Sequence, residues 1–121
     1  MGLYNTLTAL VVCSFCEHEH EDRIQFQYGL TRQLEYVLGQ DLQWDHAHER
    51  ANVGVTGAQH VVVYCISEAD ACPRCGRVYQ PHESPEYDPH IIENRLHSVN
   101  PMESYERYRA EEGGRFYVPL A

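Results

Sequence analysis

Five cysteines are the residues of this sequence whose type and spacing most directly suggest chemistry. Four of them form two Cys-x-x-Cys pairs, Cys13/Cys16 and Cys72/Cys75. In such a turn two thiolates can reach one zinc ion at about 2.3 Å, and two turns complete a tetrahedral shell. We therefore predict one structural Zn²⁺ bound by Cys13, Cys16, Cys72 and Cys75, which ties the start of the chain to its middle.

The second pair has the more complete sequence of a zinc knuckle. Pro73 restricts the backbone of the turn, and Gly76 lets the following amides point toward the sulfur atoms. The 55 residues between Cys16 and Cys72 exceed the usual spacing, so we expect a zinc ribbon with a β insertion. Two alternatives stay open here: a thioredoxin-type redox pair, although neither motif has the strand-to-helix context that this requires, and two independent disulfides.

Other candidates for chemistry are weaker. The sequence contains no G-x-S-x-G, no H-E-x-x-H and no Gly-rich phosphate loop after a strand. Two H-x-H pairs, His18/His20 and His46/His48, are candidates for a second metal site because alternate residues of a strand share a face. Solvated polar turns are the simpler interpretation of both pairs. Cys65 lies in an apolar run and is predicted to be a buried packing residue.

The charge balance indicates which partners the protein attracts. The chain has 18 acidic and nine basic residues, all nine of them arginine, for a net charge of −9. A negative field repels nucleic acid, which is bound by replacing its counterions with Lys and Arg. We therefore expect a partner protein with a basic surface and no direct contact with nucleic acid.

The location of the protein is predicted from what the sequence lacks. No stretch approaches the roughly 18 apolar residues of a membrane span, and the first 12 residues lack the cationic start and cleavage site of a signal peptide. We expect no membrane association and a cytoplasmic location, where cysteines stay reduced and available to a metal.

The hydrophobic pattern predicts one mostly β domain over residues 1–121, with an antiparallel sheet, a zinc-ribbon-like site and one short C-terminal helix. We expect a strand at 8–12, a hairpin of 24–28 with 34–38, a central strand at 61–66, and a hairpin over 91–99 that turns at Asn94 and Arg95. Loops are expected at 17–22, 41–57 and 81–89, the last because its prolines oppose ladder pairing. Residues 102–112 are the best helix candidate, within a C-terminal extension at 101–121.

Two acidic loops are the candidates for contact with the partner. The first carries Trp44, which is either an interface anchor or part of the core. The predicted partner-binding residues are Asp41, Trp44, Asp45, Glu49, Glu83, Glu86 and Asp88.

Four short motifs occur in a fixed order: Met1 to Thr6 (MGLYNT), Cys13 to Cys16 (CSFC), Ile24 to Tyr28 (IQFQY) and Cys72 to Gly76 (CPRCG). In this the sequence resembles a group of small bacterial and phage proteins that begin M-G-[ML]-[YF]-[DN]-T and carry zinc-ribbon cysteines before an F-Q-x-K/Y-type strand. The resemblance spans roughly residues 1–99. It implies a β-rich, zinc-ribbon-like fold, with 101–121 as an addition.

Three classes of function are compatible with the sequence. We favour a non-enzymatic, zinc-stabilised acidic protein that binds and inhibits a partner, as the immunity protein of a toxin–immunity pair or a phage anti-host factor does. The alternative is a zinc-ribbon adaptor subunit of a nucleic-acid-processing complex. A catalyst that uses the histidine-rich loop is the least favoured, since four sulfur ligands leave zinc no open position for substrate.

Overall fold

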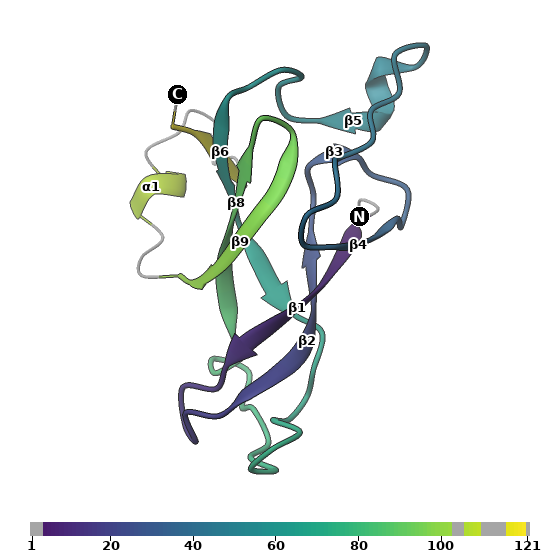
Figure 1. Ribbon diagram of the computed structural model, residues 1–121. Helices are drawn as coiled ribbons and strands as arrows, with labels where there is room; N and C mark the ends of the chain where they lie inside the picture. The colour runs from purple at the N-terminus through teal and green to yellow at the C-terminus, as the bar shows by residue number, and fades with distance from the viewer. Residues whose placement is uncertain (1–3, 103–105, 110–115, 121) are drawn as a thin grey trace.

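The computed structural model (Figure 1) describes residues 4–102, 106–109 and 116–120. It is mostly β, with 47% strand and 5% helix, as the sequence predicts. The elements in chain order are β1 (Asn5–Val12), β2 (Glu19–Phe26), β3 (Gly29–Leu30), β4 (Glu35–Val37), the 3-10 helix η1 (Glu49–Ala51), β5 (Asn52–Val53), β6 (His60–Val63), β7 (Cys65–Ser67), β8 (Glu86–Ile92), β9 (Arg95–Pro101), α1 (Glu106–Arg109) and β10 (Tyr117–Pro119).

The main sheet has the order β10-β6-β8-β7-β2-β1-β4, with β9 paired to β8, and all its pairs are antiparallel except β1 with β4. Two edges of this sheet, β9 and the segment that follows β4, meet through backbone hydrogen bonds. Gly39 donates its N–H to the carbonyl of Leu96 at 2.7 Å, Leu96 donates to Gln40 at 3.0 Å, and Leu42 donates to Asn94 at 2.9 Å. The path from β9 through β8, β7, β2, β1 and β4 therefore closes on itself, which protects strand edges that would otherwise be open.

The closed path surrounds a single hydrophobic cluster. β2 alternates exposed and buried residues along its length, as expected of a strand with one face toward a core. The cluster includes Leu7, Ala9, Val11, Ile24, Phe26, Tyr28, Tyr36, Leu42, Val61, Val63, Cys65, Tyr87, Ile91 and Leu96. Full burial of each large apolar side chain contributes about 1.5–3 kcal/mol, so this cluster is the main source of stability.

The predicted central strand at 61–66 forms, but as two pieces. β6 and β7 share one register along β8, with Val61 opposite Ile91 and Cys65 opposite Tyr87. Between them the register reaches Pro89, which has no N–H to donate to a ladder. The other neighbour also changes here: β6 pairs with β10, whereas β7 pairs with β2.

The hairpin predicted over 91–99 is confirmed, with its turn one residue earlier than expected. β8 and β9 pair from Ile92 and Arg95 outward. The two turn residues, Glu93 and Asn94, have φ of 49° and 69°. Two consecutive positive φ values are the mark of a type I′ turn, whose twist matches that of the flanking strands.

The hairpin predicted between 24–28 and 34–38 is wrong. β2 pairs with β1 and β7, and β4 lies parallel to β1 on its other side. The expected turn at 17–22 is also wrong from Glu19 onward, because β2 begins there.

Asn5 explains why the chain leaves β2 without turning straight back. Its side chain is fully buried. Its Nδ2 donates to the carbonyls of Tyr28 and Leu30 at 3.2 and 3.0 Å, and its Oδ1 accepts the N–H of Leu34 at 3.0 Å. In a connection this wide, the backbone groups lack the partners that a tight hairpin provides. The Asn5 side chain supplies those partners instead.

The surface loop predicted at 81–89 is wrong for its last four residues. They belong to β8, and Tyr87, Asp88 and Pro89 are buried. The predicted helix at 102–112 is present as α1, a single turn; residues 103–105 and 110–112 lie outside the described residues. Among the described residues, no helix combines the length and apolar character needed to cross a membrane.

The far end of the sheet is closed around the ring of Tyr28, which is 1% exposed. Trp44 and Tyr117 meet this ring edge-on, with centroids 5.5 and 5.3 Å away. The Tyr28 hydroxyl donates to the carbonyl of Val55 at 3.1 Å. Gly54, with φ of +100°, passes directly over the ring, and a Cβ there would lie 2.1 Å from a ring carbon.

We predict that Gly54→Ala lowers the free energy of unfolding by about 3 kcal/mol or more, because it adds overpacking of the Tyr28 ring to backbone strain. Gly57→Ala is the matched control: Gly57 also has positive φ, +82°, but a Cβ there meets nothing within 4 Å. It should cost only about 1 kcal/mol. Urea unfolding of both variants checks this, and equal losses would contradict it.

Candidate metal centre

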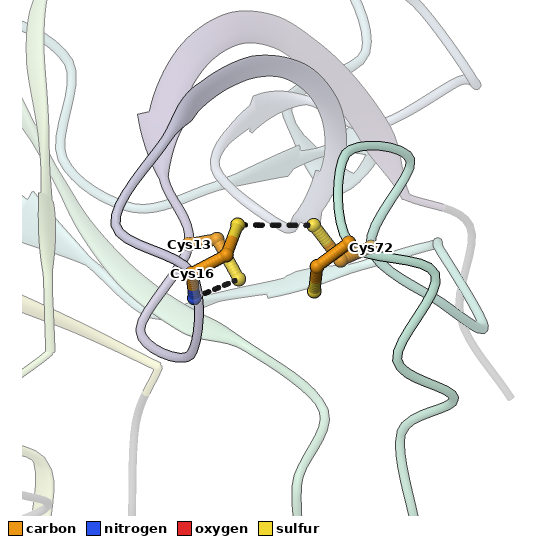
Figure 2. Close-up of side chains that lie close together, drawn as sticks. Cys13, Cys16 and Cys72 are labelled. Carbon is orange, nitrogen blue, oxygen red and sulfur yellow. Dashed lines mark hydrogen bonds between the residues drawn. The ribbon is translucent and has the colours of Figure 1, made fainter.

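The four cysteines of the predicted zinc site come together. The sulfur atoms of Cys13, Cys16, Cys72 and Cys75 all lie within 4.8 Å of one another. Figure 2 shows Cys16 and Cys72 facing each other from separate loops, with their Sγ atoms 3.9 Å apart. Tetrahedral coordination with metal–sulfur bonds of about 2.3 Å requires sulfur–sulfur distances of about 3.8 Å. The four sulfur atoms are therefore close enough together that they could hold a metal ion.

The first cysteine pair lies in the connection between β1 and β2. The Cys13 N–H donates to the carbonyl of His18 at 3.1 Å, and the Glu17 N–H donates to the carbonyl of Cys13 at 2.9 Å. The antiparallel pair of Val12 with Glu19 closes the turn. Glu17 has φ of 61°, a left-handed conformation that costs a side-chain-bearing residue about 1 kcal/mol.

The second pair repeats this geometry position by position. The Cys72 N–H donates to the carbonyl of Arg77 at 3.0 Å, and the Gly76 N–H donates to the carbonyl of Cys72 at 2.9 Å. A bridge between Ala71 and Val78 closes this turn. Gly76, with φ of 73°, holds the place that Glu17 holds in the first turn. The structure thus contains two equivalent knuckles, although only the second has the expected glycine.

Backbone amides approach one sulfur atom in each knuckle. The N–H of Phe15 lies 3.4 Å from the Cys13 sulfur, and that of Arg74 lies 3.4 Å from the Cys72 sulfur. The backbone N–H of Cys75, followed by that of Arg74, lowers the pKa of the Cys72 thiol from 9.0 to about 6. Thiolates rather than thiols bind metals, so this sulfur is already suited to be a ligand near neutral pH.

Side chains around the cluster join the two knuckles a second time. The guanidinium of Arg77 lies 3.9 Å from the centroid of the Phe15 ring and forms an ion pair with Glu83 at 2.7 Å. Tyr79 lies beside the same ring, with a centroid distance of 6.5 Å. Phe15 from the first knuckle therefore contacts residues that follow the second, although it stays 44% exposed.

The other metal candidates do not form a site in the described part of the chain. His18, His46 and His48 are exposed, and only the cysteines bring three or more possible ligands together among the described residues. Cys65 is fully buried, and burial raises the pKa of its thiol well above 9.0, as expected of a packing residue.

Most of the predicted partner-binding acids are engaged within the molecule. Asp41 pairs with Arg95 at 3.2 Å, and Glu83 pairs with Arg77. Glu86 accepts the Tyr64 hydroxyl at 2.5 Å. Asp88 is 5% exposed and accepts the hydroxyl of Tyr108, so it presents no carboxylate at the surface.

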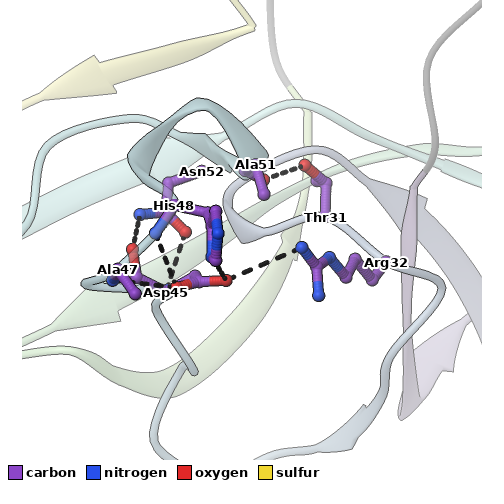
Figure 3. A network of polar contacts seen from close by, with 7 residues as sticks. All are labelled: Thr31, Arg32, Asp45, Ala47, His48, Ala51 and Asn52. Atoms are coloured by element: carbon purple, nitrogen blue, oxygen red, sulfur yellow. Dashed lines mark hydrogen bonds and ion pairs between the residues drawn. The ribbon is translucent and has the colours of Figure 1, made fainter.

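Asp45 organises its own loop (Figure 3). Its Oδ1 accepts the N–H groups of Ala47 and His48, both at 2.9 Å, and its Oδ2 lies 3.6 Å from Arg32. Asn52 bridges the backbone N–H and carbonyl of Asp45 at 2.9 and 2.8 Å. The N–H of His48 is the main cause of a lowered pKa for Asp45.

The remaining two residues of this loop differ in role. Trp44 packs against the core and donates its Nε1–H to the Asn94 side chain at 2.7 Å, which supports the core interpretation. Glu49 lies in η1 and is exposed.

The sequence analysis missed a different group of acids. Glu17, Glu19 and Glu21 are exposed, and none of them forms an ion pair within the part of the chain that the structure describes. We call these three residues the acidic hairpin end. The signal is the alternation E-H-E-H-E-D over residues 17–22. It has the period of a strand, but because all six residues are polar it resembles a turn.

Comparison with known proteins gives no match: no family model, curated protein or solved structure matches this chain.

We predict that Glu17→Gly raises the free energy of unfolding by about 0.5–1 kcal/mol, because it removes left-handed strain from the first knuckle. Gly76→Ala, the converse change at the equivalent position, should lower it by about 1 kcal/mol. Chemical denaturation of the metal-loaded protein measures both. Opposite signs support equivalent knuckles, and a destabilising Glu17→Gly would count against them.

Proposed function

We propose that this protein is a zinc-stabilised acidic binding protein, without a catalytic role, that binds and inhibits a partner protein with a basic surface. The metal is zinc in this proposal because four thiolates at tetrahedral spacing are a typical structural zinc shell. Such a shell is closed, so the ion acts on folding rather than on a substrate. A cytoplasmic location, where thiols stay reduced, is part of the same proposal.

The observation that carries this proposal is how the charges are distributed. Of the six arginines with described side chains, four are already paired with acids of the same chain: Arg23, Arg32, Arg77 and Arg95. The acidic hairpin end has no such partners in the described structure. The negative charge of its carboxylates is therefore available to attract another molecule. A basic surface is the kind of surface that this charge attracts most strongly.

Inhibition is the form of binding that we favour. A small, rigid acidic domain can cover a basic surface that otherwise binds nucleic acid, as a toxin's immunity protein or a phage anti-host factor does. An adaptor role in a nucleic-acid-processing complex is the second candidate, because paired zinc knuckles are the feature it shares with zinc ribbons. Identifying the captured partner distinguishes an inhibitor from an adaptor.

We predict that native mass spectrometry of protein purified without chelator shows one zinc ion per chain. Removing the ion opens a loop of roughly 60 residues, so unfolding free energy should fall by about 4 kcal/mol and the melting temperature by roughly 15 °C. Cys75→Ser should reproduce the loss without chelator. A metal-free protein with an unchanged melting temperature would contradict a structural role for zinc.

For partner binding, the expected result is that reversing Glu17, Glu19 and Glu21 together to lysine abolishes capture of a basic protein from extracts of the source cell. Reversal of Glu35, Glu93 and Glu106 is the control, since these exposed acids lie on other parts of the fold and change the net charge by the same amount. Capture must survive in the control, and the captured protein's own activity must fall when the wild type is added. Equal loss in both variants would indicate bulk charge attraction without a binding site.

A further inference from the structure

The outer surface of β1 changes character along the strand. Alternate residues of a strand share a face, and on the face of β1 turned away from the core lie Thr6, Thr8, Leu10 and Val12. The first two are polar, as expected of a sheet face turned to solvent. The last two are apolar, and Leu10 is 61% exposed and Val12 50% exposed.

The neighbouring strand extends this apolar surface. Val37 of β4 lies opposite Thr8 in the parallel pair, so it shares the outer face of β1 and is placed diagonally to Leu10. Val37 is 51% exposed. Single exposed apolar residues are common on protein surfaces, whereas a group of them on one face indicates an interaction site. We call Leu10, Val12 and Val37 the apolar face.

Two carboxylates of the acidic hairpin end border the apolar face on its β2 side. Leu10 lies directly opposite Glu21, and Val12 lies directly opposite Glu19. The Cβ atoms of directly opposite residues are about 4.5–5.5 Å apart, and their side chains project from the same face of the sheet. Each of these two exposed apolar side chains therefore has an exposed carboxylate beside it.

The other end of the same surface is neutralised within the molecule. Arg23 pairs with Glu35 at 3.0 Å and with Glu68 at 3.8 Å. Its Nη2 also lies 3.5 Å from the Thr6 hydroxyl, over the polar half of β1. The acids without an ion pair in the described structure thus coincide with the apolar half. An apolar centre with a charged rim is the usual composition of a protein–protein interface.

The charge of the rim decides between a second copy of this chain and a different partner. A second copy seated on the apolar face would bring Glu19 and Glu21 of both chains into one interface. Each chain also has a net charge of −9, and like charges placed across an interface oppose association. A basic partner is attracted by the same carboxylates while its own apolar surface covers Leu10 and Val12.

We propose that the apolar face is the centre of the surface that docks the basic partner protein. It takes an apolar patch of that partner that is flanked on one side by arginine or lysine side chains, which pair with Glu19 and Glu21. The inference rests on the proposed function and adds the face of the sheet and the chemistry of the contact.

The test uses the zinc-loaded full chain and the basic protein that the wild type retains from extracts of the source cell, purified and titrated by calorimetry. Leu10→Thr combined with Val12→Thr removes apolar surface, keeps the net charge and retains strand propensity. Affinity should fall at least tenfold, with an unchanged dependence on salt. The matched control is Leu120→Thr combined with Val55→Thr, the same residue types at sites 48% and 47% exposed, and affinity should change less than twofold.

Neutralising the flanking acids should have a different effect on the same titration. Glu19→Gln combined with Glu21→Gln should weaken binding at low salt and make the affinity less dependent on salt, because it removes charge and keeps the apolar face. Glu93→Gln combined with Glu106→Gln changes the net charge equally at exposed sites elsewhere and should leave the salt dependence near that of the wild type.

Equal affinity of the Leu10→Thr/Val12→Thr variant and its control would overturn the docking surface and leave the proposed function standing. Retention of no basic protein by the wild type would reject both. A dimer in sedimentation that this variant lacks would also overturn the proposal, because a second copy then covers the apolar face. If the double variant fails to fold, Val37→Thr on β4 replaces it, with at least threefold weaker binding expected.

Discussion

The contact between two knuckles, far apart in sequence, is the constraint on which one end of this molecule depends. Cys13 directly follows β1, and Cys72 follows β7. The strands β1 and β7 lie on either side of β2. The segment from Pro73 to Val78 is exposed throughout and has one β-bridge to hold it. So little apolar burial cannot order a long loop, and a metal ion held by the four cysteines would supply the stability that the core does not. The contacts of Phe15 with Arg77 and Tyr79 exist only while the knuckles stay together.

The opposite end of the sheet solves the same problem without a metal. There the Tyr28 ring, Gly54 and the Asp45–Asn52 hydrogen bonds order a loop that also has little regular structure. These contacts depend on complementary shape and satisfied polar groups, so they tolerate few substitutions. Unlike thiolates, they do not respond to changes in redox state or pH. If the four cysteines bind a metal ion, its release should therefore loosen one end of the molecule and leave the other folded.

The parts of this structure that the sequence predicts are those whose chemistry is local. Two Cys-x-x-Cys motifs identify all four cysteines of the cluster, because each turn needs only its own residues to orient its sulfurs. The hairpin of β8 and β9 is predicted for the same reason, with its turn misplaced by one residue. The partner of each strand is not local: β4 lies beside β1 because Asn5 fixes the connection between β2 and β4, and nothing in the alternation of either strand shows this. The acids behave likewise, since Asp41 is neutralised by Arg95, 54 residues away.

The position of β6 between β8 and β10 has a consequence for the newly made chain. β6 is almost entirely valine, and its second edge is covered only by β10, which is synthesised much later. Until then the growing polypeptide carries an apolar, strand-forming edge with free hydrogen-bonding groups, the kind of surface that recruits other chains into aggregates. During synthesis the chain is therefore prone to aggregate from the time β6 is made until β10 pairs with it. A ribosome that stalls between these two points would leave the edge of β6 exposed to neighbouring nascent chains.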